Sequence, residues 1–198
     1  NEFFAPASAL MKRIPIYSIP GNHEHDAAFY YRYMYVPRPY YYSFRYGNAE
    51  IFMLDTNQYQ EEGTDMYNWL EHALAQSTAY WKFVVHHHPP YSSDEDDFGD
   101  TNVEASTLGD DEARGLTSLY DKYGVDIVFY GHIHTYERSW PVRENKTVTE
   151  NGVIYLNVGG AGGRLENPSP IRSWFTSKLR TVHHFGYVAI NGNTLQFQ

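Results

Sequence analysis

Three short apolar runs, each followed at once by a polar cluster, constrain the fold of this chain more than any other feature. The runs at residues 14–19, 81–85 and 125–130 have the length and side-chain type of β-strands. The clusters after them read GNHE at residues 21–24, HHH at residues 86–88 and GHIH at residues 131–134. Because loops at the carboxyl ends of parallel strands meet at one edge of a sheet, these clusters are expected to converge. The sequence therefore predicts a sheet with a polar site along its edge.

The segments around these runs alternate between helix and strand. Apolar residues recur at helical spacing from Met66 to Leu74, and again within residues 111–123. Gly47-Asn48 and Asn191-Gly192 are turn signals, each between two strand-like runs. Helices are expected at residues 3–11, 66–74 and 111–123, and further strands at residues 40–46, 50–54, 153–158, 186–190 and 194–197. The alternation predicts an α/β fold with some antiparallel pairing.

Composition sets the broad class of protein. A chain of 198 residues is within the usual size of one domain. Its formal net charge of −9 argues against a nucleic-acid partner, because phosphate backbones are met by clustered Lys and Arg. The sequence contains no cysteine, which excludes disulfides and thiolate metal ligands. No apolar run is long enough for a membrane span, so we expect a single domain without one.

The histidine and asparagine side chains of the three clusters are suitable metal ligands. Imidazole nitrogen and amide oxygen suit zinc, iron or manganese. In an extended backbone, His132 and His134 project to the same side and could reach neighbouring metals. Taken singly, each cluster also has an ordinary interpretation, GNHE as a turn and HHH as a partly buried strand end. Their order along the chain, each after a strand, favours a metal site.

The motifs GNHE, VVHHHPPY and YGHIHTYER, in this order, resemble the last three of five metal-ligand motifs in purple acid phosphatases and related calcineurin-like phosphoesterases. Segments between them resemble that family too, among them residues 54–57 (LDTN) and 159–163 (GGAGG). The resemblance covers effectively the whole chain. It implies a layered α/β/β/α sandwich and a centre that holds two metal ions.

The resemblance also implies roles for single residues. Asn22, His87 and His132 would bind the second, divalent metal, and His134 the first metal, which is ferric in the coloured members. His87 is chosen within the histidine run because the family spacing His-x-Pro-x-Tyr fits residues 87–91. The implied cofactors are two metal ions, iron with zinc, manganese or a second iron.

His23 is the implied catalytic residue. It would lie beside the metals and could hydrogen-bond a phosphate oxygen or protonate the leaving group. Glu24, Tyr136, Glu137 and Arg138 resemble positions that orient the ligands. Two metals about 3.5 to 4 Å apart lower the pKa of a bound water and neutralise the phosphoryl oxygens, so that hydroxide can attack in line.

Two aspartate motifs that precede GNHE in the family are absent from this sequence. We therefore expect residues 1–198 to be the C-terminal part of a single catalytic domain, incomplete at its N-terminus. A preceding segment would supply the remaining ligands, and a homo-oligomer is a further possibility. The acidic stretch at residues 92–100 also departs from the family, and we expect it to be a solvated loop.

The expected function is metal-dependent hydrolysis of small phosphate monoesters by a secreted or periplasmic protein. Asn145-Lys146-Thr147 is an acceptor sequence for N-glycosylation, so a glycoprotein is expected. One alternative is a catalytically incomplete structural or assembly protein, with the tyrosine-rich residues 30–46 as an interface. Another is a phosphodiesterase or nucleotidase on the same centre.

Overall fold

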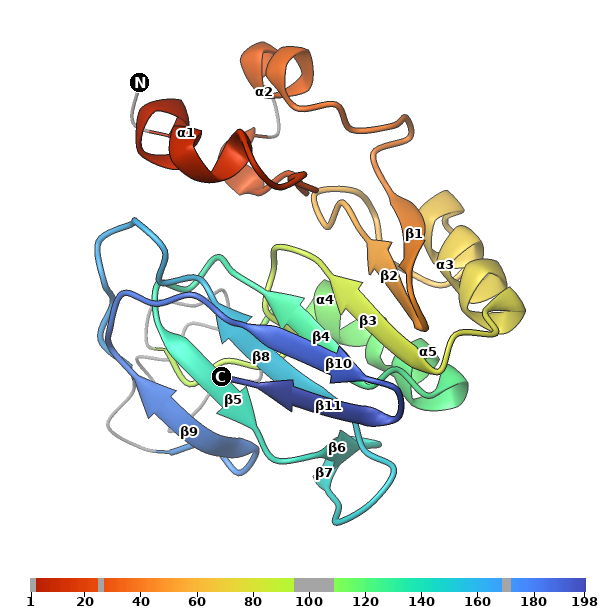
Figure 1. The fold of residues 1–198 in the computed structure, drawn as a ribbon. Helices are drawn as coiled ribbons and strands as arrows, with labels where there is room; N and C mark the ends of the chain where they lie inside the picture. Colours follow the sequence, from red (N-terminus) through yellow and green to blue (C-terminus); the bar gives the residue numbers. More distant parts are fainter. Residues whose placement is uncertain (1–2, 25–26, 95–108, 169–171) are drawn as a thin grey trace.

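A seven-stranded mixed sheet forms the centre of the molecule (Figure 1). The computed structural model describes residues 3–24, 27–94, 109–168 and 172–198. In spatial order the strands are β1 (Tyr42–Tyr46), β2 (Ala49–Met53), β3 (Trp81–Val85), β4 (Ile127–Tyr130), β8 (Ile154–Val158), β5 (Tyr136–Ser139) and β9 (Thr176–Arg180). The four strands β2, β3, β4 and β8 run parallel, and β1, β5 and β9 are antiparallel to their neighbours. The parallel centre places the loops after β3 and β4 at the same edge.

Helices cover one face of this sheet. They are α3 (Asp65–Gln76), α4 (Asp111–Gly115) and α5 (Thr117–Tyr123). The apolar stripe of α3 is buried through Met66, Leu70 and Leu74, which join Phe52 and Val84 of the sheet in the larger core. Burial of such side chains contributes about 1.5–3 kcal/mol each. This helix therefore forms where the spacing of apolar residues predicts it.

A hairpin lies against the other face of the sheet (Figure 1). It consists of β10 (Val188–Asn191) and β11 (Thr194–Phe197), joined through Gly192 at φ 60°. Ile190, Leu195 and Phe197 pack on a second core made by sheet residues. The described residues thus give three layers, helices, central sheet and hairpin, and the expected α/β class is confirmed.

Most expected elements are present, with some shifted boundaries. The hairpin of β1 and β2 turns at Gly47, whose φ is 60°. The helix expected over residues 111–123 is divided at Leu116 into α4 and α5. At the division, Thr117 Oγ1 donates a hydrogen bond to Arg114 O at 2.7 Å. Gly124, in the left-handed region, ends α5. In the part of the chain that the structure describes, no helix is long and apolar enough to cross a membrane.

Several strands have too little apolar periodicity to be predicted. These are β5 and β9, with the two-residue strands β6 (Val142–Arg143) and β7 (Lys146–Thr147). In β5 the inward residues are Glu137 and Ser139, which are polar and buried. Their hydrogen bonds to other segments replace the apolar contacts that sequence patterns detect.

The described residues before β1 differ from the rest of the chain. They contain α1 (Phe4–Met11), where a helix was expected, the 3-10 turn η1 (Asn22–Glu24), and α2 (Ala28–Tyr33), which the sequence did not predict. The strand expected at residues 14–19 is wrong, because no described strand lies beside this segment to complete a ladder. Ile14 and Tyr17 are instead 47% and 52% exposed.

Candidate metal centre

The loops after β3 and β4 bring two histidines together. The parallel pairing continues beyond the strand ends, since His86 N donates to Phe129 O at 3.1 Å and Gly131 N donates to His87 O at 3.2 Å. His87 Nε2 consequently lies 3.1 Å from His132 Nδ1. The convergence expected from two of the three clusters is therefore present.

Asn22 reaches the same point from the first cluster. Its Oδ1 lies 2.9 Å from His87 Nε2. Glu24 closes the turn, because its Oε2 accepts a hydrogen bond from Gly21 N at 3.0 Å. Gly21 permits the approach, since a Cβ there would lie 2.7 Å from His87 Cε1. The turn at Gly21 thus lets Asn22 face His87 without a strand before it.

His88 is a member of this cluster that sequence reasoning missed. His87, His88 and His132 each offer one ring nitrogen, and these three nitrogens lie within 4.8 Å of one another. His88 Nδ1 lies 2.8 Å from Thr56 Oγ1, which fixes its ring. The only sequence signal for His88 was its place in the run of three histidines, because the family spacing selected His87 as the ligand.

His86 has a different environment from its two neighbours. It is fully buried, with its ring stacked at 6.3 Å from Tyr120 and 6.1 Å from Tyr130. Burial lowers the pKa of His86 to about 3. It is a neutral core residue on the helix-covered side.

Burial also keeps the clustered imidazoles neutral. The pKa of His87 is lowered to about 3 and that of His132 to about 4, first by burial and then by the neighbouring imidazoles. Neutral imidazoles offer lone pairs to a metal. The donor-atom separations of 2.9 and 3.1 Å also match adjacent ligands of an ion bound at about 2.1 Å, which stand roughly 3.0 Å apart in octahedral geometry. The donor set therefore fits a divalent transition metal.

His134 is not one of the three clustered imidazoles, although its charge lowers the pKa of His132. His132 has φ 67° and Ile133 N donates to Gly131 O at 2.8 Å, so the backbone makes a tight turn here. The extended backbone considered for His132 and His134 is therefore wrong. His134 N donates to Glu166 Oε2 at 2.7 Å, and its Nδ1 lies 2.8 Å from Arg164 O.

This arrangement gives His134 a defined ring state. A carbonyl accepts only from a protonated nitrogen, so Nδ1 carries a proton and Nε2 is the ring nitrogen left for a further partner. Gly163 packs on the ring face, where a Cβ would lie 2.5 Å from His134 Cε1. The ring of His134 is thus held from two sides, by the Arg164 carbonyl and by Gly163.

His23 is exposed on η1, beside the cluster. It is close enough that its charge lowers the pKa values of His87 and His132. Its ring is therefore placed to contact a group bound at the cluster.

The residues expected to orient ligands divide into two kinds. Glu24 acts directly on the Gly21 turn. Glu137 is buried away from the histidines, accepts hydrogen bonds from Ser93 and Thr176, and has a pKa that burial raises. Tyr136 contacts His184 edge-on, and the Arg138 guanidinium lies over Phe197. The last three support the sheet.

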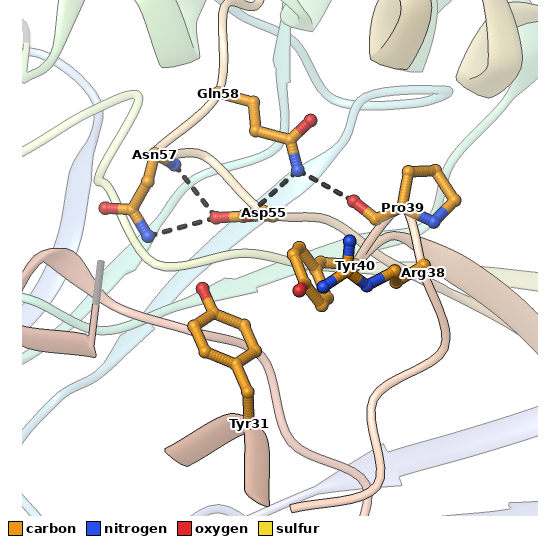
Figure 2. A pocket seen from close by; sticks show the side chains of 7 residues that line it. All are labelled: Tyr31, Arg38, Pro39, Tyr40, Asp55, Asn57 and Gln58. Atoms are coloured by element: carbon orange, nitrogen blue, oxygen red, sulfur yellow. Dashed lines mark hydrogen bonds between the residues drawn. The ribbon is translucent and has the colours of Figure 1, made fainter. Parts of the chain in front are cut away.

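A cavity of about 410 Å³ lies between the loop before β1 and the loop after β2 (Figure 2). It is lined by Tyr31, Arg38, Pro39, Tyr40, Asp55, Asn57 and Gln58. The loop after β2 joins it to the histidines, because Asn57 Nδ2 donates to Gly21 O at 3.0 Å and Thr56 contacts His88. Sequence reasoning did not identify this cavity, since its lining residues carry no motif.

Two other expectations concern polar loops. Of the acidic stretch at residues 92–100, residues 95–100 lie outside the described residues; Ser92, Ser93 and Asp94 are buried. Asn145 is exposed in the turn between β6 and β7, and its Oδ1 accepts a hydrogen bond from Tyr91 at 2.6 Å.

The fold is that of a mixed α/β protein with a cluster of imidazole and amide donors at the edge of its sheet, and comparison with known families places it. Residues 1–136 match the family described as calcineurin-like phosphoesterase. The chain belongs to this family. Within it the relatives are purple acid phosphatases, as the motifs predict.

Individual relatives sharpen this placement. The chain is 27% identical to an Arabidopsis thaliana protein named probable inactive purple acid phosphatase 24, over 98% of this chain and 36% of that protein. It is 36% identical to probable purple acid phosphatase 20 of the same plant, over 64% of this chain and 28% of that protein. It is 29% identical to acid phosphatase type 7 of Danio rerio, over 96% of this chain and 50% of that protein.

Solved structures agree with the fold. Purple acid phosphatase PPD1 from yellow lupin superposes with a TM-score of 0.66 at 28% identity, over 80% of this chain and 30% of that chain. The Plasmodium protein GAP50 shares the fold, with a TM-score of 0.56 at 17% identity over 80% of this chain and 48% of that chain. The chain thus spans half or less of the relatives named here.

Proposed function

We propose that this chain is part of a metal-dependent phosphatase that hydrolyses small phosphate monoesters at a binuclear centre. The observation that carries the proposal is the convergence of Asn22 Oδ1 and His132 Nδ1 on His87 Nε2, each within hydrogen-bonding distance of it. Three neutral donors at one point, in a family of phosphoesterases, support a metal site more than a structural cluster.

Each residue has a stated part in this proposal. Asn22, His87 and His132 would hold one ion and His134 the other, with the remaining ligands from a preceding segment of the protein. The ions would be iron with zinc, manganese or a second iron, and when bound they lower the pKa of water and neutralise phosphoryl oxygens. His23 donates a hydrogen bond to a phosphate oxygen or a proton to the leaving group.

The neighbourhood of the ligands supports this division of roles. Gly21 leaves room for His87, and Thr56 holds His88 beside it. Arg164 O fixes the tautomer of His134, so that Nε2 is the free donor. Because these partners hold the rings before any ligand arrives, little ordering is needed on binding.

The decisive experiment uses the full-length protein. Metal content is measured by elemental analysis, and hydrolysis of an aryl phosphate is followed between about pH 5 and 7, where this proposal expects activity. His132→Ala should abolish turnover and lower bound metal while circular dichroism stays native. His72→Ala, at an exposed position on α3, is the matched control and should keep both. Full activity of His132→Ala would refute the ligand assignment.

A structural or assembly protein is the second candidate, favoured by relatives whose names include "probable inactive". A full-length protein that binds only trace metal and hydrolyses nothing would select it. A phosphodiesterase or nucleotidase is the third, and a barley relative at 25% identity is named nucleotide pyrophosphatase/phosphodiesterase. Faster hydrolysis of diesters than of monoesters would select that one.

Secretion or a periplasmic location is also proposed, with glycosylation at Asn145 where the route allows it. The exposed turn between β6 and β7 supports this, because an acceptor asparagine must be accessible. A mass shift on treatment with an N-glycosidase, absent in Thr147→Ala, would test it.

A further inference from the structure

One wall of the cavity beside the candidate centre is aromatic (Figure 2). The Tyr31 and Tyr40 rings lie with centroids 4.5 Å apart and planes inclined by 39°, and both side chains are half-buried. Tilted and offset ring contacts at such separations are favourable. A flat ring that enters the cavity can therefore extend this contact, at little cost in side-chain freedom.

Arg38 brings a positive charge to the same cavity. Its guanidinium carbon lies 5.5 Å from the centroid of the Tyr40 ring, and the residue is exposed. None of the ion pairs within the described ranges involves Arg38. A guanidinium presents a planar fork of donors that matches a carboxylate or phosphate. In a chain of net charge −9, a cation that lies over an aromatic ring and forms no ion pair with a described residue is suited to an anionic ligand.

Asp55 also lines the cavity, but its carboxylate is engaged by neutral donors. The residue is 3% exposed and accepts hydrogen bonds from Asn57 N at 3.2 Å, Asn57 Nδ2 at 3.0 Å and Gln58 Nε2 at 2.9 Å. Figure 2 shows these bonds around Asp55, with Gln58 also donating to Pro39 O at 2.8 Å. The carboxylate thus orders its own loop, and Gln58 joins that loop to the one that carries Arg38 and Tyr40.

The backbone at Tyr40 is a further, independent observation. Its φ is 79°, a region that bulky side chains rarely adopt, and its N donates to Pro37 O at 2.7 Å. Residues held in such conformations concentrate at ligand sites, where the surrounding structure determines them. Here the turn directs the Tyr40 ring against Tyr31 and under Arg38.

From these contacts we propose that the cavity binds the leaving group of the phosphoester, and that it selects a planar aromatic ring carrying a negative charge. Tyr31 and Tyr40 pack on the ring, and Arg38 binds the anion. The inference rests on the proposed function, because Asn57 and Thr56 connect the cavity to Gly21 and His88 of the candidate centre. Arg38 is then a specificity-determining residue.

Three substrates separate the contributions in the full-length protein. They are 4-carboxyphenyl phosphate, phenyl phosphate and glycerol 2-phosphate. Arg38→Gln should lower the ratio of kcat/KM for 4-carboxyphenyl phosphate over phenyl phosphate by about tenfold, the loss of one charge-assisted interaction. Tyr40→Ala should lower the ratio of phenyl phosphate over glycerol 2-phosphate by roughly threefold to tenfold.

Matched controls come from the same segment. Arg32→Gln and Tyr35→Ala remove the same side-chain types outside the cavity lining, and Tyr35 is 97% exposed. Both should keep the wild-type ratios. If Arg38→Gln keeps them as well, the specificity assignment is overturned.

A binding measurement separates this inference from the proposed function. The full-length protein is treated with EDTA, and 4-hydroxybenzoate, the alcohol product, is titrated by calorimetry. Wild type should bind, and Arg38→Gln should bind about tenfold more weakly. Binding through Arg38 in a protein that hydrolyses nothing would sink the proposed function alone. Absence of binding to wild type, or equal binding to Arg38→Gln, would overturn the cavity proposal.

Discussion

The candidate centre draws its donors from two regions with very different surroundings. His87 and His132 lie at the ends of core strands, and Asn22 lies in the residues before β1. His87 and His132 follow β3 and β4, whose residues Val84 and Val128 are fully buried in the core that the sheet shares with α3 and α5. Asn22, by contrast, lies between α1 and α2 in the chain, and neither of these helices contains a buried residue. Figure 1 shows these two helices beyond the edge of the sheet, away from its covered faces.

Neighbouring strands decide whether an apolar run becomes part of the sheet. Residues 81–85 and 14–19 are similar in apolar character, yet only the first has a strand on each side to complete its backbone hydrogen bonds. Without those neighbours, residues 14–19 form neither a strand nor a helix. One ligand of the centre therefore depends on the less packed region, and the other two on the core.

The largest expected effect compares the same substitution in both regions. Leu70→Ala in α3 removes a side chain with 0% exposure and should destabilise the protein by about 2–5 kcal/mol. Leu10→Ala in α1, at 57% exposure, should change stability by no more than about 0.5 kcal/mol. Urea unfolding followed by circular dichroism measures both. Equal losses would mean that α1 is packed in solution.

A metal ion bound by Asn22, His87 and His132 should join the residues before β1 more firmly to the core strands. Zn²⁺ at about 100 times its dissociation constant should stabilise the folded protein by about 2.7 kcal/mol, and EDTA should reverse this. Hydrogen exchange should slow at residues 86–88, 131–134 and 21–22, and much less in Phe4–Met11. A gain of equal size in His132→Ala would show that the ions bind elsewhere.

Packing around His134 provides the next comparison. Gly163→Ala places a Cβ 2.5 Å from His134 Cε1 and should cost about 1–3 kcal/mol as the ring is displaced. Gly162→Ala meets no atom within 4 Å and is the matched control. Imidazole NMR signals of His134 should move only in the Gly163 variant. If both variants leave those signals in place, the ring does not pack on Gly163.

The smallest effect concerns helix ends. Asp110 Oδ1 accepts a hydrogen bond from Ala113 N at 2.7 Å and caps α4, so Asp110→Ala should cost about 1 kcal/mol. Ser8 in α1 donates to Ala5 O near the surface, and Ser8→Ala should change stability by less than about 0.5 kcal/mol because alanine favours helix. Thermal unfolding of the two variants ranks them. The reverse order would contradict the contrast between the regions.

Much of the fold was predictable wherever apolar periodicity is strong. The stripe from Met66 to Leu74 gave a helix, the turn signals at Gly47 and Gly192 gave hairpins, and residues 81–85 gave a strand with the predicted bounds. Strand β5 was missed because its buried side chains are polar and satisfied by distant partners such as Ser93. Such partners are set by tertiary contact, which no local pattern contains.

The candidate site was predictable to a similar degree. The order of the motifs identified Asn22, His87 and His132 as candidate ligands. The structure places the donor atoms of Asn22 and His132 beside His87 Nε2. His88 was not predicted, because its position depends on Thr56, a residue 32 positions earlier in the chain. The extended geometry expected around His132 was wrong, because its φ of 67° turns the chain.

By itself, the sequence determined the family, the parallel strands and the residue types at their ends, because hydrophobic spacing and motif order are properties of the chain. Only the tertiary structure decided which atoms meet. The 3.1 Å approach of His87 to His132 follows from the neighbouring positions of β3 and β4. The cavity of Tyr31, Arg38 and Tyr40 follows from two loops joined through Gln58, which donates to Pro39 O. Both are distances between segments far apart in sequence, and packing rather than local preference sets them.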